Sequence, residues 1–492
     1  MEIGSLLHLQ GEYHESNQLL ESAERFTETE PDIRSSVTRA LIGKEITPYT
    51  ATDFEKMFIN YYKLTNYLSL AQLSPYQQER DTLLDGARVE ARRIDIKLNE
   101  LAIQHGTHKE AAERKRSALG QLSSFLKVIT GTRIDKQDLI YRDDPWSHYL
   151  AGYTYEQLDE LDSARLEYEK AAVLYESGAK AQYQLQGNIT EQAWFDTIRV
   201  MKKAGGYEDR WQQLSETKLS AELRGHLETS AENGQLLVVE QVGLAPQKKT
   251  LQVVLTAHSY TRSLVLAPML TGTLQNQRDQ QAWFYLLYAD KASLVGLANL
   301  HSAGIINGTI YSLTRKTIPL GGAWDSAMEL GIPQALQFGA RVSVPYYSLL
   351  RSSPGPSVLS VGTETVQLSD STSVAQLAIQ EQLQQANWEI YEGLTREIIK
   401  AITTDKLGGI PGLGSLTSWL TASSDSRSWL TLPQQIRMTR VFLTPGKHIA
   451  KLSSQVRHGQ PAKLSSKQFT IKKGQNILWL NNSLASTNAT AL

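Results

Sequence analysis

Residues 146–175 read WSHYLAGYTYEQLDELDSARLEYEKAAVLY, and this stretch decides the fold class of the amino-terminal half. Its first part, around Gly152, has the composition of a helix, and an acidic turn separates it from a second helix. On that second helix Ala164, Tyr168 and Ala171 recur at intervals of four and three residues, which places them on one face. Small residues at a helix crossing, with tyrosines beside them, are typical of the tetratricopeptide repeat, a helix–turn–helix of about 34 residues.

The same spacing recurs in two further segments of the chain. Residues 2–26 repeat it with Gly11 in the turn. A looser copy has a tyrosine-rich first helix at 54–73, an extended connection at 74–85, and a returning helix with small residues on its packing face. Because one such unit cannot bury its apolar face alone, the units must stack. We therefore predict a TPR-like α-solenoid over residues 1–230, with a generic helical bundle as the alternative.

Short runs of β-branched and apolar residues replace the helical periodicity in the second half. We predict an α+β chain in which a mixed α/β domain at 231–446 follows the helices. It carries a variable insertion at about 271–339, and a small β-rich tail module occupies 447–492. In that tail, the runs at 469–471 and 477–480 flank a turn and predict a hairpin.

Composition excludes several classes of site. Lys and Arg number 50 against 51 Asp and Glu, so the chain has no overall basic field that favours nucleic acid. The absence of cysteine excludes disulfides, zinc–thiolate sites, iron–sulfur clusters and cysteine nucleophiles. No apolar run approaches the roughly 18 residues that span a bilayer.

Motifs that carry chemistry are scarce. The glycine-rich stretch at 408–415 lacks the lysine of a phosphate-binding Walker loop. His105 and His108 flank a glycine that we expect to interrupt the helix, which is unlike a helical metal site. Asp143 and Asp144 supply too few oxygens for calcium and more simply begin a helix. We therefore expect no catalytic residue, no metal ligand and no cofactor.

Partner binding is the stronger hypothesis. In repeats of this type the first helices line the concave surface, which predicts that Tyr149, Tyr153 and Glu156 face outward. Tyrosine offers large contact area at low entropic cost. Arg88 and Arg92, four residues apart, form a basic patch suited to an acidic partner. Helix–helix packing for the tyrosines, and ordinary surface ion pairs for the arginines, are the alternatives.

Three stretches carry a family resemblance: DGARVEARR at 85–93, QLLVV with GLAP between 235 and 246, and DSRSWLTLP at 425–433. Together they resemble a poorly characterised family of bacterial tetratricopeptide-repeat lipoproteins of the cell envelope, over most of the chain except 271–339. The resemblance implies helical repeats before a mixed α/β region, and a protein exported and lipidated on an amino-terminal cysteine. Some members look associated with outer-membrane assembly or secretion proteins.

These observations predict a non-catalytic scaffold or adaptor that binds protein partners in a bacterial cell-envelope assembly or secretion complex. The alternative is an envelope enzyme acting on glycan or peptide, with a site within 235–445. A third hypothesis is peripheral membrane contact through the apolar segment 407–420. The expected location is the periplasmic face of the outer membrane if an upstream signal and lipobox have been removed, and the cytoplasm otherwise.

Overall fold

The structure is a computed structural model of the chain, and it describes residues 1–28, 49, 51–115, 144–180, 183–230, 232–288, 315–336, 339–348, 354–379, 381–382, 390, 425–455 and 461–483. These residues form an α+β protein in which helices precede most of the strands. None of the described helices combines the length and the apolar character needed to cross a membrane.

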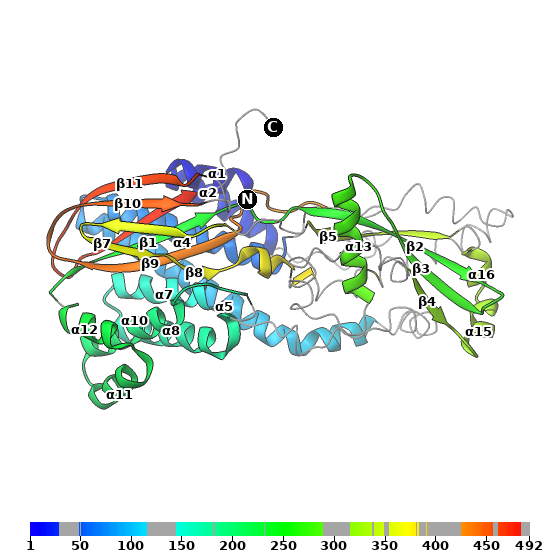
Figure 1. Cartoon of the computed structure of the whole chain (residues 1–492), viewed down its shortest axis with the longest axis horizontal. Coiled ribbons are helices and arrows are strands. Elements are labelled where there is room, and N and C mark those ends of the chain that lie inside the picture. Colours follow the sequence, from blue (N-terminus) through cyan, green and yellow to red (C-terminus); the bar gives the residue numbers. More distant parts are fainter. Residues whose placement is uncertain are drawn as a thin grey trace.

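The amino-terminal half consists of helices that pack in sequence order, with α1 against α2, α4 against α5, and α7 against α8 (Figure 1). A π-helical turn, η3 (Tyr175–Ala179), follows α8. The helices are α1 (Glu2–Gln10), α2 (Tyr13–Glu28), α4 (Asp53–Leu73), α5 (Gln77–Lys115), α7 (Pro145–Gln157), α8 (Leu161–Leu174), α10 (Ile189–Ala204), α11 (Glu208–Lys218) and α12 (Ala221–Thr229).

The helix–turn–helix expected at 146–175 is confirmed as α7 and α8. Ala164, Tyr168 and Ala171 are all buried on one face of α8. Gly152 brings the two helices close together, since a Cβ added there would lie 2.9 Å from the Tyr168 ring. The amino end of α7 is fixed by Asp144, whose side chain accepts a hydrogen bond from the Ser147 backbone N–H at 3.1 Å.

Two expectations about the third helical unit are wrong. α5 already begins at Gln77, so 74–85 is not an extended connection. Its first turns are rich in Gln, Glu and Leu, which favour a helix even without an apolar stripe. α5 also runs through Gly106 to Lys115 without interruption, because a single glycine costs only about 1 kcal/mol in a long helix.

Within the described residues the strands form three four-stranded sheets, ordered β12-β1-β9-β8, β11-β10-β6-β7 and β4-β3-β2-β5. Every strand pair is antiparallel except β1 with β12. The strands are β1 (Gly234–Val242), β2 (Lys248–His258), β3 (Ser263–Met269), β4 (Lys316–Pro319), β5 (Ala340–Tyr347), β6 (Ser357–Val361), β7 (Glu364–Gln367), β8 (Ser369–Thr372), β9 (Gln435–Leu443), β10 (Gly446–Ser454), β11 (Lys463–Ile471) and β12 (Asn476–Ser483).

The sheet β12-β1-β9-β8, here called the central sheet, is covered on both faces. Leu237 and Val239 of β1 point to the helices and join the same core as α4, α7 and α10. Leu236 and Val238 point the other way and form a second core with the sheet β11-β10-β6-β7. Every residue of β1 is therefore buried, which explains the run of four apolar residues at its centre. The layers run from the helices to the central sheet and then to the sheet β11-β10-β6-β7, here called the outer sheet (Figure 1).

The tail does not form the expected hairpin. β11 pairs with β10 in the outer sheet, whereas β12 pairs with β1 in the central sheet. The turn at 472–475, with Gly474 at a φ of 68°, therefore carries the chain from one sheet to the other. The boundary expected between 446 and 447 falls at the start of β10, and the strands after it pair with strands before it, β12 with β1 and β10 with β6.

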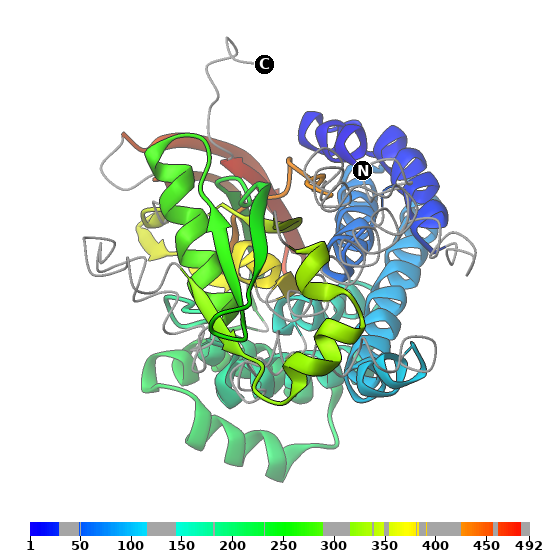
Figure 2. The same ribbon diagram turned by 90° about the vertical axis from the view of Figure 1, so that its right-hand side faces the viewer.

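The third sheet, β4-β3-β2-β5, forms an arm that extends away from the helices (Figure 1), and Figure 2 views it end-on. Three helices accompany it: α13 (Leu274–Tyr288), α15 (Ala323–Glu329) and α16 (Ile332–Ala335). The segment expected to be an insertion at 271–339 thus supplies α13, β4, α15 and α16 to this arm. Trp283 attaches α13 to this sheet, because its indole N–H donates a hydrogen bond to the backbone oxygen of Tyr347 in β5 at 2.6 Å.

A matched pair of substitutions tests the close approach of α7 and α8. We expect Gly152→Ala to lower the free energy of unfolding by about 1 to 3 kcal/mol, because the new methyl overlaps a buried ring that has no room to move. Gly225→Ala on α12 meets no atom within 4 Å and should leave stability unchanged or raise it by up to about 1 kcal/mol. Urea unfolding of both variants measures the difference, and equal effects would contradict the packing described here.

Candidate functional site

The three residues expected to face outward from α7 are buried instead. Tyr149 and Tyr153 are at most 2% exposed, and Glu156 is 5% exposed. The reason is that the chain's own central sheet covers this side of the helices. Arg440 of β9 hydrogen-bonds Glu156 and lies over the ring of Tyr153, and its charge also acts on Tyr149. The outward orientation predicted from the repeat pattern is therefore wrong.

Glu156, Asp196, Arg199 and Arg440 form what we call the buried ion network. Arg199 of α10 binds Glu156 through two parallel hydrogen bonds of 2.7 and 2.8 Å. Arg440 reaches across from β9 to Glu156 at 3.2 Å and to Asp196. Two acids and two bases balance, so the network is neutral as a unit.

Tyrosines complete the coordination of this network. Tyr149 donates to Asp196 at 2.5 Å and Tyr168 donates to Glu156 at 2.9 Å. Burial opposes ionisation of Glu156, but Arg199 and Arg440 more than offset it and hold the pKa of this carboxyl well below its usual range. The arrangement fixes the sheet on the helices through charges contributed by α7, α10 and β9.

The two arginines of α5 are placed differently from each other. Arg88 binds Glu160, in the turn before α8, at 2.7 Å and Asp85 at 2.7 Å, so its charge is used within the chain. Arg92 is exposed and hydrogen-bonds Tyr155, which opposes the rise that burial causes in the pKa of that tyrosine. Partner binding by Arg92 stays a prediction.

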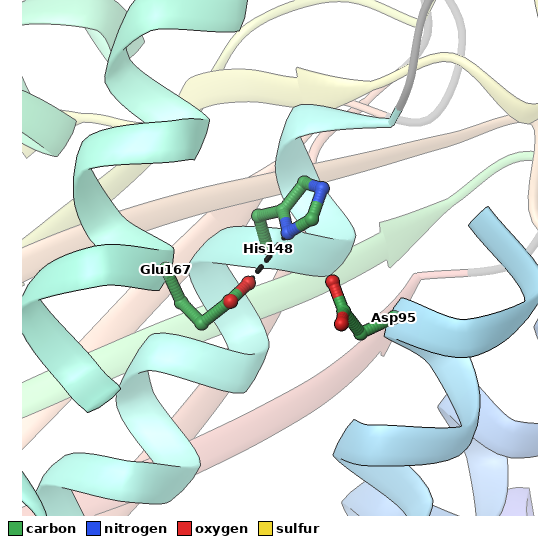
Figure 3. Close-up of side chains that lie close together, drawn as sticks. All are labelled: Asp95, His148 and Glu167. Atoms are coloured by element: carbon green, nitrogen blue, oxygen red, sulfur yellow. Dashed lines mark hydrogen bonds and ion pairs between the residues drawn. The ribbon is translucent and has the colours of Figure 1, made fainter. Parts of the chain in front are cut away.

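Three helices bring Asp95, His148 and Glu167 together, with ligand atoms within 4.8 Å of one another (Figure 3). His148 Nδ1 lies 2.5 Å from Glu167, a hydrogen bond too short for a metal ion to lie between the two atoms. The ammonium group of Lys170 contacts Glu167 at 2.7 Å and Asp95 at 3.1 Å. Lys170 therefore supplies the positive charge that a divalent cation would bring.

Burial opposes ionisation of Glu167 as well, but hydrogen bonds from His148 and Lys170 outweigh it and hold its pKa below the usual value. The cluster links α5 to α7 and α8, since Asp95, His148 and Glu167 come from these three helices.

A second group of acids is likewise neutralised by a lysine of the chain. Glu21, Glu24 and Glu90 converge between α2, α4 and α5 with spacing that a cation could use. The buried ammonium of Lys63 occupies the centre, 2.6 Å from Glu24 and 2.9 Å from Glu90, and it also binds Glu21. Arg93 and Lys97 contribute two further positive charges, so three acids face three bases.

An open pocket of about 610 Å³ lies beside the π-helical turn η3. Glu176 is the carboxylate among its lining residues, and Lys218 binds it at 2.6 Å.

Glu381 is a buried carboxyl outside this pocket. Its burial, and then the charge of Asp53, raise its pKa to about 8. Its two oxygens accept the backbone N–H groups of Asp53 and Phe54 at 2.9 and 3.2 Å, so it caps helix α4.

Sequence reasoning missed Asp196, Arg199, Arg440 and Lys63. A signal existed for Arg440, because an arginine inside the apolar strand QIRMTRVFL must meet a buried acid. The partner acids lie 244 and 284 positions away, and a single sequence does not pair them. Asp143 and the segment 407–420 lie outside the described residues.

Removing Arg440 tests the buried ion network. Arg440→Met leaves two buried carboxylates with Arg199 alone, and we expect the free energy of unfolding to fall by about 3 to 5 kcal/mol. As a control, Lys203→Met removes an exposed ion pair with Asp159 and should cost less than about 1 kcal/mol. Urea unfolding compares the two variants, and a similar small loss in both would contradict the role assigned to Arg440.

Acid titration tests the Lys63 cluster. Burial opposes ionisation of Glu24, yet Lys63 and Lys97 lower its pKa from 4.5 to about 2 in the folded chain. This carboxylate therefore stabilises the fold fully above about pH 4.5, and the stabilisation is lost as pH falls toward 2. Glu24→Gln should be less stable than the native chain at pH 7, with a difference that closes as pH falls. A difference independent of pH would exclude this assignment.

Comparison of the chain with protein-family models, with curated proteins and with solved structures finds no match. The resemblance carried by the stretches at 85–93, 235–246 and 425–433 therefore stays a prediction. What the chain does has to be argued from the geometry of its described residues.

Proposed function

We propose that the protein is a non-catalytic scaffold of the TPR type, which binds protein partners in a bacterial cell-envelope assembly or secretion complex. The observation that carries this proposal is the contrast between the charged clusters of the body and the tip of the arm. The acid-rich clusters of the body are paired internally, whereas the arm presents an aromatic residue entirely to solvent.

The tip of the arm is the feature best suited to partner binding. Tyr260 lies in the turn between β2 and β3 and is 100% exposed. Arg262 follows it in a left-handed conformation, with φ 49°, and its backbone oxygen accepts a hydrogen bond from Leu320 at 3.0 Å. The turn is thereby held in one shape. Tyrosine and arginine are the residue types enriched at the energetic centres of protein interfaces.

The helical pairs support the TPR part of the proposal, and they also restrict it. α7 and α8 cross at Gly152, and α1 and α2 cross where Gly4 contacts Leu20. The side of α7 that binds a peptide in a free solenoid contacts β9 in this chain. A partner therefore has to bind at the arm or on outward helix surfaces such as that of Arg92.

The catalytic alternative called for a cleft within 235–445 that holds two converging carboxylates. Glu381 has the raised pKa, but its oxygens are engaged by the start of α4. The pocket beside η3 lies outside that range and its carboxylate is paired. No observation on the described residues favours an enzyme over a scaffold.

Site-specific crosslinking tests the proposal. A photoreactive phenylalanine analogue in place of Tyr260 should yield a discrete crosslinked protein in the host cell. The same analogue in place of Tyr76, which is 71% exposed between α4 and α5, is the matched control and should yield none. Tyr260→Ala should weaken the purified complex by at least about tenfold.

Crosslinks that are absent at position 260, or equal at the two positions, would contradict partner binding by the arm. Substitution of Tyr149 or Tyr153 gives no such test, because both side chains are buried and their removal would disturb the fold.

A further inference from the structure

The charges of the chain are distributed unevenly along its length. All 51 acidic residues precede residue 426, whereas ten of the 50 basic residues follow it. The carboxy-terminal strands β9 to β12 therefore contain no carboxylate of their own. Any neutralisation of their positive charge has to come from another part of the chain or from a partner.

Part of this positive charge is used internally. Four of the basic residues bind acids from earlier in the sequence: Arg427 with Asp425, Arg437 with Asp370, Arg440 with Glu156 and Asp196, and Lys473 with Glu232. Lys463 and Lys467 donate to backbone oxygens of β12. Among the described residues, Lys447, Lys451 and Lys472 have no carboxylate within ion-pair distance.

Lys447 and Lys451 lie on one side of the sheet β11-β10-β6-β7, and Lys472 lies just beyond the end of it. Along β10 the side chains of Ala450 and Leu452 point inward to the core, so the alternating positions 447, 449 and 451 point outward. Lys472 directly follows β11, at the end where Lys447 lies opposite Thr470. Figure 1 shows β10 and β11 on the side of the molecule away from α8, α10 and α11.

We call this surface the outer face. Two aliphatic side chains accompany the lysines on it: Ile449, 54% exposed between Lys447 and Lys451, and Leu464, 78% exposed on β11. The other outward positions on the sheet are uncharged: Val358, Ser360, Thr365, Gln367, Ser453, Ser466, Gln468 and Thr470.

The residue types of the outer face distinguish between anionic partners. Protein interfaces are depleted in lysine, and their strongest contacts come from tryptophan, tyrosine and arginine, none of which is among the described residues of this face. Single-stranded nucleic acid requires aromatic side chains for stacking, which the face also lacks. Lysines beside exposed aliphatic side chains suit a lipid headgroup layer, because the stems pack on apolar groups while the ammonium groups meet phosphate.

We propose that the outer face binds the surface of an anionic lipid bilayer. Lys447, Lys451 and Lys472 contact the phosphate groups, and Ile449 with Leu464 enters the boundary between headgroups and acyl chains. Each lysine near such a surface strengthens binding by about fivefold. The arm is a separate element, so this contact leaves Tyr260 free for a protein.

Vesicle co-sedimentation of the full chain tests the proposal. The protein should bind vesicles of phosphatidylcholine with added phosphatidylglycerol and not vesicles of phosphatidylcholine alone. Binding should disappear as salt rises from about 0.1 M to about 1 M, which shortens the Debye length from about 10 Å to about 3 Å. The triple variant Lys447→Glu, Lys451→Glu, Lys472→Glu should lose at least tenfold in partitioning. Lys202→Glu, Lys203→Glu, Lys218→Glu on α10 and α11 changes the net charge equally and should bind as the native chain does.

A second measurement locates the contact. Because the chain has no cysteine, Ile449→Cys carries an environment-sensitive fluorophore at a single position. Its emission should shift to shorter wavelength on anionic vesicles, whereas Gln212→Cys on α11 should not respond. Equal loss of binding in both triple variants, a fluorophore at 449 that does not respond, or binding to soluble heparin without binding to vesicles would each overturn the proposal.

Discussion

The burial of the central sheet on both faces is the constraint on which the rest of the structure depends. A strand with protein on each side has no solvated face, so a charge on it is costly to bury unless an opposite charge lies beside it. Arg440 is such a charge, and Glu156 and Asp196 meet it from α7 and α10. The helices are thus joined to the sheet by apolar packing together with one neutral group of four ionised side chains.

The same balance recurs in the other charged clusters of the body. Lys63 stands among three glutamates, and Lys170 stands between Asp95 and Glu167, in places where a metal ion would otherwise fit. Each lysine supplies the positive charge that a metal ion would otherwise bring to these carboxylates. These lysines explain how convergent carboxylates can lie close together in the interior of the fold.

The sequence predicted local helical structure well and long-range structure poorly. The spacing of Ala164, Tyr168 and Ala171 located α7 and α8, because residues three and four apart settle which face of a helix packs. The same pattern carried no information about what covers the side of α7 on which Tyr149 lies. Tyr149 was therefore expected to be exposed, but it is buried. Likewise, the run at 477–480 located β12, but its partner β1 lies more than 230 residues earlier. Pairing over such distances is decided by the whole fold.

The parallel pairing of β1 with β12 has a consequence for how the protein is made. A ribosome adds about 5 to 20 residues each second, so β1 waits on the order of 10 to 50 seconds for its neighbour. During that interval the apolar faces of Leu237 and Val239 and the acids of α7 and α10 have no sheet to complete them. Native burial of the helical half therefore has to wait until β12 has been made, long after the helices themselves have left the ribosome.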